Sequence, residues 1–376
     1  MENDVVVRKK KEKSGIFAGI ICLLLGTILL FYNEARAVDT RKVIGIAKDE
    51  MIEVSSAVVD QNNEGKLIVT SGKINLINDM VYDEEFNVGV KSAKLNRIVE
   101  MYQWYEDCED DSNGKEKCTY SKKWSSSIVD DSGFESGHNN PDQMPYSEKV
   151  ILMSNVKLGE FKLNDELLNQ LSTESVYNEL SESVASSRNM YVTDGYYTSY
   201  SKDEVAEVGD VRISFKYNDA SDITVMGVQN NGTFIEFSTD KNDYTILKLE
   251  EKILSGEEFI KELHSENNII TWIFRFVGTI FMIAGVASIL SIIKYLASFI
   301  PFLGKLVINA IGLVSILVGL SLSLLIISIS WFIVRPVLSI VLLIAIGGLI
   351  YLIIVINKKK NINSVNEVKN ESNEAL

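Results

Sequence analysis

The C-terminal part of the chain, residues 269–356, is a nearly uninterrupted apolar block. It divides into three segments, and each is long enough to cross roughly 30 Å of hydrocarbon, which needs about 20 mostly apolar residues. The segments are residues 269–293, whose one charge is Arg275, and residues 306–334 and 336–356, which carry no charge. A soluble domain can bury one such helix but hardly three in succession, so the block predicts an integral membrane protein.

A further apolar run, residues 15–32, follows Arg8 and several lysines near the N-terminus. This layout fits either a retained transmembrane helix or a cleaved signal peptide. We expect a retained helix, because the run is longer than the apolar core of a usual signal peptide. The small residues Ala35 and Ala37 match a cleavage site only in part.

The basic residues that flank the spans predict their orientation. Lysines and arginines next to spans stay in the cytoplasm, and they cluster both before residue 15 and at Lys358–Lys360. Four spans place both ends on the same side, so the two clusters agree. We expect a cytoplasmic basic N-terminus, residues 1–14; spans at 15–32, 269–293, 306–334 and 336–356; a large non-cytoplasmic domain, 33–268; and a polar cytoplasmic tail, 357–376.

The large domain is strongly acidic. Residues 33–268 hold 45 acidic and 24 basic residues, a net charge of −21, within a chain whose net charge is −14. Nucleic-acid binding is excluded as a function class, because phosphate contacts need clustered lysine and arginine. The chain has three cysteines, two histidines and no C-x-x-C pair, so we predict no metal site and no cofactor.

The pattern of the large domain predicts an α+β fold. Alternating β-branched and aromatic residues indicate strands, and apolar residues at helical spacing indicate helices. Ser255 and Glu258 form a capping box for a helix that runs into the second span. We expect strands at residues 66–76, 94–105, 119–129, 208–217, 223–228 and 233–237, and helices at 36–57 and 161–184, the latter capped by Asn164.

Cys108 and Cys118 lie symmetrically about Asn113 and Gly114, a dipeptide that favours a hairpin turn because both residues tolerate positive φ. If the flanking strands pair, the two sulfurs lie close together. In an oxidising compartment they would then form a disulfide. The alternative, two unrelated free thiols, stays open at this point.

The sequence contains no fingerprint of a hydrolase, a metalloprotease or a nucleotide-binding protein. His138 has no nucleophile motif beside it, so we interpret it as a structural residue in a turn. Trp104 and its aromatic neighbours either pack the sheet or form an exposed patch for lipid or a partner. Arg275 either reaches the membrane interface or pairs with a lipid phosphate or a carboxylate of the domain. Trp272 and Arg335 are further candidates for lipid or interface contact.

Several of these stretches together resemble the transmembrane protein 43 (LUMA) family, in the family's order from the first span to the last. The most specific is the segment from Val99 to Trp104. The resemblance points to motif residues that we interpret as structural: Asn33, Glu34, Arg36, Glu100, Met101, Tyr102, Gln103, Trp104, Gly137, His138, Asn140, Pro141, Gly209 and Asp210.

The resemblance implies a four-span protein with one large lumenal domain and no established catalytic site. Eukaryotic relatives look like endoplasmic-reticulum and inner-nuclear-membrane proteins that associate with lamins and emerin and help organise the nuclear envelope, and a bacterial relative would lie in the plasma membrane. We therefore expect a non-enzymatic membrane scaffold that contacts lipids and other membrane proteins and forms homo-oligomers. The alternatives are a channel subunit, because small residues in the spans permit close helix packing around a pore, and a hydrolase acting at the membrane.

The predicted topology can be tested by cysteine labelling. In a chain whose native cysteines are replaced by serine, a probe at position 113 should react with a membrane-impermeant reagent from outside the cytoplasm. Probes at positions 5 and 370 should stay protected, because the basic clusters hold both termini inside. Labelling of position 113 from the cytoplasm would contradict the topology.

Overall fold

The computed structural model describes residues 4–9, 15–76, 80–110, 115–239, 242–297 and 304–334, together with 340 and 344. The chain forms two compact units. The large domain comprises Lys42–Ser265 with the N-terminal strand, and the membrane unit comprises Ser14–Arg41 and the chain from Glu266 onward. The two long helices that enter the large domain contribute residues to both units.

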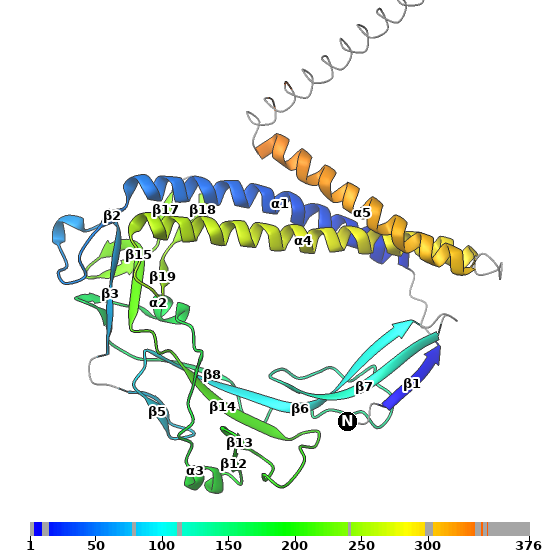
Figure 1. Ribbon diagram of the computed structural model, residues 1–376, viewed down its shortest axis with the longest axis horizontal. Coiled ribbons are helices and arrows are strands. Elements are labelled where there is room, and N and C mark those ends of the chain that lie inside the picture. Colours follow the sequence, from blue (N-terminus) through cyan, green and yellow to red (C-terminus); the bar gives the residue numbers. More distant parts are fainter. Residues whose placement is uncertain are drawn as a thin grey trace, which may run out of the picture. The chain divides into compact units, whose positions relative to one another are not determined.

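Three helices are long and apolar enough to span a membrane: α1 (Gly15–Glu50), α4 (Gly256–Ala297) and α5 (Gly304–Val334) (Figure 1). They confirm apolar helices at the first three predicted spans. α1 continues through Ala37 without an extended segment. Retention of the first apolar run stays a prediction. Apart from positions 340 and 344, the fourth predicted span, the tail 357–376 and Arg335 lie outside the described residues.

The first sheet of the large domain is built around one long strand. Its strands are β1 (Asp4–Lys9), β6 (Lys94–Asp110), β7 (Lys115–Ser125), β8 (Lys149–Leu152), β11 (Ser175–Val176), β12 (Tyr191–Thr193), β13 (Tyr196–Thr198) and β14 (Val211–Tyr217). The order is β1-β7-β6-β14-β13-β12, with β8 paired to β6 and β11 to β14. The N-terminal half of β6 therefore lies beside β14, and its C-terminal half forms a hairpin with β7.

The second sheet joins segments from both ends of the large domain. Its strands are β2 (Ile52–Glu53), β3 (Leu67–Leu76), β9 (Val156–Leu158), β10 (Phe161–Lys162), β15 (Asp222–Asn230), β16 (Thr233–Ile235) and β19 (Lys248–Glu250). The order is β10-β9-β3-β15-β16, with β19 paired to β15 and β2 parallel to β3. Two small hairpins, β4 (Val81–Asp83) with β5 (Val88–Val90) and β17 (Phe237–Thr239) with β18 (Asn242–Ile246), complete the described strands.

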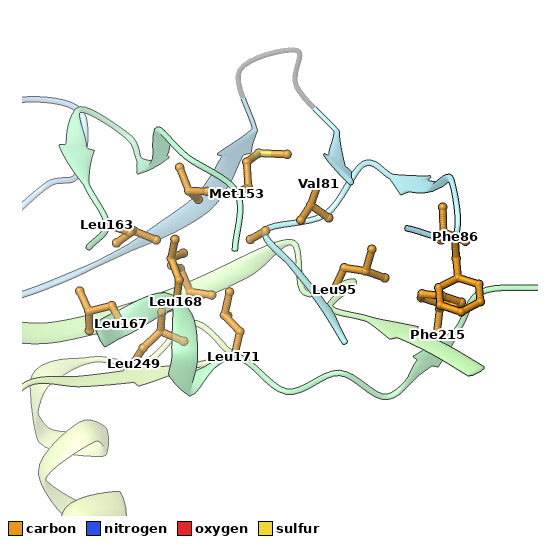
Figure 2. Close-up of a cluster of buried hydrophobic side chains, with 14 of the residues drawn as sticks. Val81, Phe86, Leu95, Met153, Leu163, Leu167, Leu168, Leu171, Phe215 and Leu249 are labelled. Atoms are coloured by element: carbon orange, nitrogen blue, oxygen red, sulfur yellow. The ribbon is translucent and has the colours of Figure 1, made fainter. Parts of the chain in front are cut away.

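The second sheet is covered on both faces, because side chains alternate between the faces of a strand. Ile68 of β3 points into a core shared with the first sheet and with α2 (Asp165–Gln170), part of which Figure 2 shows. Leu67 and Val69, its neighbours, point into a second core. There they pack against the last turns of α1 and the first turns of α4, where Phe259 is fully buried. The two helices therefore form part of the domain's own core.

The predicted helix over residues 161–184 is wrong in extent. The structure has β10, α2, β11 and α3 (Glu182–Ser187) in this region, although Asn164 caps α2 by accepting a hydrogen bond from the Leu167 amide at 3.0 Å. Lys94 of β6 stops α2: its Nζ donates to the carbonyls of Asn169 and Leu171 at 2.6 and 2.7 Å. Burial lowers the pKa of Lys94. The tertiary contact satisfies the carbonyls that a longer helix would have bonded internally.

Residues 4–9, expected in the cytoplasmic N-terminus, form β1 on the edge of β7, with Asp4 opposite Tyr120 and Lys9 opposite Lys115. The run Val5–Val7 has high strand propensity. A helix that crosses a bilayer leaves its ends on opposite sides. If α1 crosses the bilayer, residues 4–9 cannot both pair with β7 in a non-cytoplasmic domain and lie in the cytoplasm. Cysteine labelling distinguishes them, because the pairing requires positions 5 and 113 to react from the same side.

The hairpin of β6 and β7 places Cys108 directly opposite Cys118, and the two are joined as a disulfide with Cα atoms 4.0 Å apart. The turn expected at Asn113 and Gly114 lies outside the described residues. Cys22, the remaining cysteine, is a half-buried free thiol in α1.

Mass spectrometry can test the disulfide. Protein purified without reductant and digested should yield one cross-linked peptide pair containing both hairpin cysteines, because strand pairing holds the sulfurs together. Replacing Cys22 by serine is the control and should leave that product unchanged. Recovery of two alkylated free thiols would contradict the pairing.

Candidate functional site

Close packing of α1 against α4 sets the frame of the membrane unit. A Cβ added to Gly19 of α1 would lie 2.8 Å from the carbonyl oxygen of Gly285 in α4, and one added to Gly26 would lie 3.1 Å from that of Gly278. A side chain at Gly19 would clash with the backbone of α4, and small residues at such contacts are typical of packed membrane helices. The polar groups that follow on α1 therefore face α4 directly.

Glu34 is the centre of a polar cluster between these helices. Its side chain is 1% exposed, and it accepts two hydrogen bonds from Arg275 of α4: from Nε to Oε1 at 2.6 Å and from Nη2 to Oε2 at 3.0 Å. A two-point pairing of this kind is among the strongest between charged side chains. Each group thereby gains a hydrogen-bonded partner of opposite formal charge in a buried position.

The third helix reaches the same carboxylate. Trp331 of α5 donates from its indole Nε1 to Glu34 Oε2 at 2.7 Å. The guanidinium carbon of Arg275 lies 4.9 Å from the ring centroid of Trp272 and 5.8 Å from that of Trp331. One side chain from each of α1, α4 and α5 therefore meets at Glu34, and we call Glu34, Arg275, Trp272 and Trp331 the span cluster.

A second set of hydrogen bonds lies next to the span cluster. Asn33 donates from Nδ2 to the carbonyl of Thr271 at 3.0 Å, and Arg36 donates from Nη2 to the Thr271 hydroxyl at 3.1 Å. Further along, Asn267 donates to the carbonyl of Ala37 at 2.9 Å. The motif that follows the first apolar run is thus used to join α1 to α4 along several turns.

Of the contacts raised for Arg275, the structure contains the pairing with a carboxylate. Its partner is a carboxylate, that of Glu34, and its side chain is 16% exposed. Trp272, in contrast, is 65% exposed on α4, and its contact with lipid stays a prediction. The sequence contained a signal for the pair that we did not use: one acid directly after an apolar run, and one base inside a later span.

In the large domain the motif residues gather along the middle of β6. Met101 and Gln103 are buried, and the Gln103 side chain bonds the backbone of Ser127 and Val129 at 2.9 Å each. At Tyr102 the backbone bonds the carbonyl of Asp210 at 2.8 Å and the amide of Gly209 at 2.9 Å. Each of these contacts ties another segment of the chain to β6.

The turn that contains Gly137, His138, Asn140 and Pro141 covers the free edge of β6. The Asn140 side chain accepts from the amide of Trp104 at 2.7 Å and donates to its carbonyl at 3.0 Å, as a neighbouring strand would. Gly137 has φ +98°, which favours glycine. Since an uncovered strand edge invites pairing with other chains, the turn protects β6 where β14 no longer accompanies it.

His138 lies against aromatic rings. Its ring stacks on that of Tyr120 with centroids 3.8 Å apart, and the Trp104 ring contacts it edge-on at 4.6 Å. The side chain is 7% exposed. These contacts are those of a packed side chain.

One face of the β6–β7 hairpin carries a row of half-buried aromatic and charged side chains. Arg212 of β14 pairs with Glu100 at 2.7 and 3.0 Å, and its guanidinium lies 4.6 Å from the ring of Trp124. Trp124 packs on Tyr102 at 5.1 Å and on Tyr200 at 6.1 Å. Burial raises the pKa of Tyr200. We call Glu100, Tyr102, Trp124, Tyr200 and Arg212 the aromatic row.

The sequence is similar to proteins of one known family. The profile of the family described as Transmembrane protein 43 matches residues 101–336. Transmembrane protein 43 of Rattus norvegicus is 29% identical over 352 residues, which cover 88% of this chain and 86% of that protein. The human protein of the same name is 29% identical over 353 residues, with the same coverage. Transmembrane protein 43 homolog of Drosophila melanogaster is 26% identical over 347 residues, covering 87% of this chain and 90% of that protein. No solved structure matches.

The span cluster generates a stability prediction. Glu34→Gln and Arg275→Gln should each destabilise the membrane unit by about 3 kcal/mol, because removing one partner leaves the other as a buried, uncompensated charge. The double variant should lose less than the sum of the two single changes. Unfolding in detergent, followed by circular dichroism, measures all three.

Arg41→Gln is the matched control. Arg41 also joins α1 to α4, through a hydrogen bond to Asn268 at 2.7 Å, but that contact is exposed. Its removal should change stability by no more than about 0.5 kcal/mol. If the Glu34 and Arg275 variants were as stable as this control, the span cluster would not hold the helices together.

Proposed function

Because the chain belongs to the transmembrane protein 43 family, we propose that it is a non-enzymatic membrane organiser whose large domain recruits protein partners. The expected resemblance to this family is confirmed, and with it a membrane protein that carries apolar helices and a mixed domain of helices and sheets. The organising role is our proposal and rests on the surface and contacts of the large domain.

The aromatic row is the main support for partner binding by the large domain. Trp124 and Tyr102 are half-buried rather than enclosed, and Arg212 lies between the rings of Trp124 and Tyr196, at 4.6 and 4.8 Å. Tryptophan, tyrosine and arginine are the residues most enriched among those that contribute strongly to protein–protein binding. Held by stacking and by the Glu100 pair, they lose little conformational freedom on binding.

The distribution of the motif residues favours a scaffold over an enzyme. A catalytic site requires a nucleophile, a base and a stabilising group within reach of one substrate position. Here Asn33, Glu34 and Arg36 join helices of the membrane unit, whereas Asn140, Gly209 and Asp210 fasten segments to β6 in the large domain. These residues are engaged in holding the two units in shape.

The channel alternative draws on the small residues of α5. In the described part of that helix, the hydroxyls of Ser315, Ser321 and Ser323 each donate to the carbonyl four residues earlier, at 2.6–2.8 Å. Hydroxyls engaged in this way line no polar path by themselves. We therefore rank the channel subunit second to the organiser.

The proposed organiser is an integral membrane protein with both termini in the cytoplasm. Its partners would be membrane lipids and other membrane proteins, including further copies of itself. In a eukaryotic cell the site of action would be the endoplasmic reticulum and inner nuclear membrane, with partners similar to lamins and emerin, and in a bacterium the plasma membrane.

The test compares variants on the two faces of the hairpin. Trp124→Ala should reduce the amount of partner protein co-purified from native membranes by about tenfold or more, since a central aromatic side chain contributes about 2 kcal/mol or more to an interface. Tyr105→Ala is the control, because Tyr105 is half-buried on the opposite face of β6. Quantitative mass spectrometry measures the yield, and melting temperatures establish that both variants fold.

His138→Gln separates the organiser from an enzyme. If His138 is structural, loss of its hydrogen bond should lower the free energy of unfolding by about 1 kcal/mol. Partner binding should then decrease only as far as the melting temperature does. A His138→Gln protein of unchanged stability that lost its cellular activity would indicate a catalytic or metal-binding role. Equal partner yields for Trp124→Ala and Tyr105→Ala would remove the aromatic row as the binding surface.

A further inference from the structure

The disulfide of the hairpin lies beside an oriented carboxylate. In the register of β6 and β7, Glu106 faces Tyr120 and Cys108 faces Cys118. Because residues two apart on a strand share a face, all four side chains lie on the same side of the hairpin. A ligand atom from each of Glu106, Cys108 and Cys118 lies within 4.8 Å of the other two.

The carboxylate of Glu106 is held by a second layer of contacts. The Tyr120 hydroxyl donates to Glu106 Oε1 and accepts from the amide of Glu135 at 2.9 Å. The Tyr120 ring is fully buried and stacks on His138 at 3.8 Å. Carboxylates that bind metal ions are typically hydrogen-bonded in this manner, because the second contact fixes the direction of the ligand atom. The aromatic contacts of His138 thereby support the position of Glu106.

Reduction would convert the sulfurs into ligands without moving the strands. A dithiol reductant attacks one sulfur of the disulfide, forms a mixed disulfide, and is released as its own disulfide when its second thiol attacks. The hairpin gains two electrons and two protons and carries two thiols. Strand pairing keeps the two Cα atoms adjacent, at 4.0 Å in the oxidised hairpin. Side-chain rotation can then bring the sulfurs to the separation of about 3.8 Å that a tetrahedral ion with Zn–S bonds of about 2.3 Å requires.

We propose that the reduced hairpin is a binding site for a thiophilic divalent cation such as Zn²⁺, held by the thiolates of Cys108 and Cys118 and by the carboxylate of Glu106. Two sulfurs and one oxygen make a three-ligand set that leaves the fourth tetrahedral position for water. Binding displaces the two thiol protons, and oxidation to the disulfide removes both sulfur ligands. The hairpin would thus bind metal only in its reduced form.

This proposal differs from our expectation from the sequence, which was no metal site. The spacing of Cys108 and Cys118 matches no common zinc motif. Glu106 lies two residues before the first cysteine, and only the β6–β7 register brings it to the same face as the second. The proposal is independent of the organising role.

Cobalt is the probe, because Co²⁺ bound to thiolate gives a charge-transfer absorption that carboxylate binding alone does not. The full chain with Cys22→Ser, in detergent, is titrated with Co²⁺ after reduction by a phosphine and again after oxidation. The reduced chain should bind one Co²⁺ with a saturable thiolate band that Zn²⁺ abolishes, and the oxidised chain should show no band. Glu106→Gln should weaken Co²⁺ binding by the reduced chain by about tenfold or more.

Glu109→Gln is the matched control. Glu109 is an exposed acid of the same strand, but it points to the opposite face, so this change should leave the affinity unaltered. A reduced chain without a saturable thiolate band would overturn the proposal, and so would equal affinities for the Glu106 and Glu109 variants. If reduction alone unfolds the large domain, added Zn²⁺ should restore the native circular dichroism, and failure to do so would also overturn it.

Discussion

The pairing of Glu34 with Arg275 is the constraint on which the membrane unit depends. A buried charged side chain needs a partner inside the protein, and here the carboxylate is shared between a guanidinium of α4 and an indole of α5. Each contact constrains the rotation of a helix about its own axis. The glycine contacts between α1 and α4 permit the approach, and the span cluster determines which faces meet.

The same two helices build the core of the large domain. Beyond the membrane unit, α1 contributes Val43 and Ile44 and α4 contributes Phe259 to a core that covers the outer face of the second sheet. That sheet is therefore buried on both sides, which explains the continuous burial of β3 from Leu67 to Thr70. Each helix contributes residues to both units.

Strand β6 has the corresponding role in the first sheet. It pairs with β14 along one edge over its first half and with β7 along the other edge over its second half. Beyond the end of β14, Gly209, Asp210 and the side chain of Asn140 bond the first of these edges at Tyr102 and Trp104. The aromatic row and the disulfide with Glu106 share one face of the hairpin. The turn that supplies Asn140 also supplies His138, which packs on Tyr120 beside Glu106, so the contacts that protect the strand also position the groups that we propose to bind metal.

Local features of the sequence determined three long apolar helices, the β6–β7 and β15–β16 hairpins, and the start of α4 after Ser255, because apolar runs, turn dipeptides and capping boxes act within a few residues. The tertiary structure decided the rest. Glu34 and Arg275 are 241 residues apart in the sequence. Likewise, α2 ends where Lys94, over 70 residues away, donates hydrogen bonds to the carbonyls of Asn169 and Leu171. The pairing of β1 with β7 joins residues more than 100 positions apart. Such contacts depend on which distant segment supplies the partner, and the periodicity of either segment alone does not contain that information.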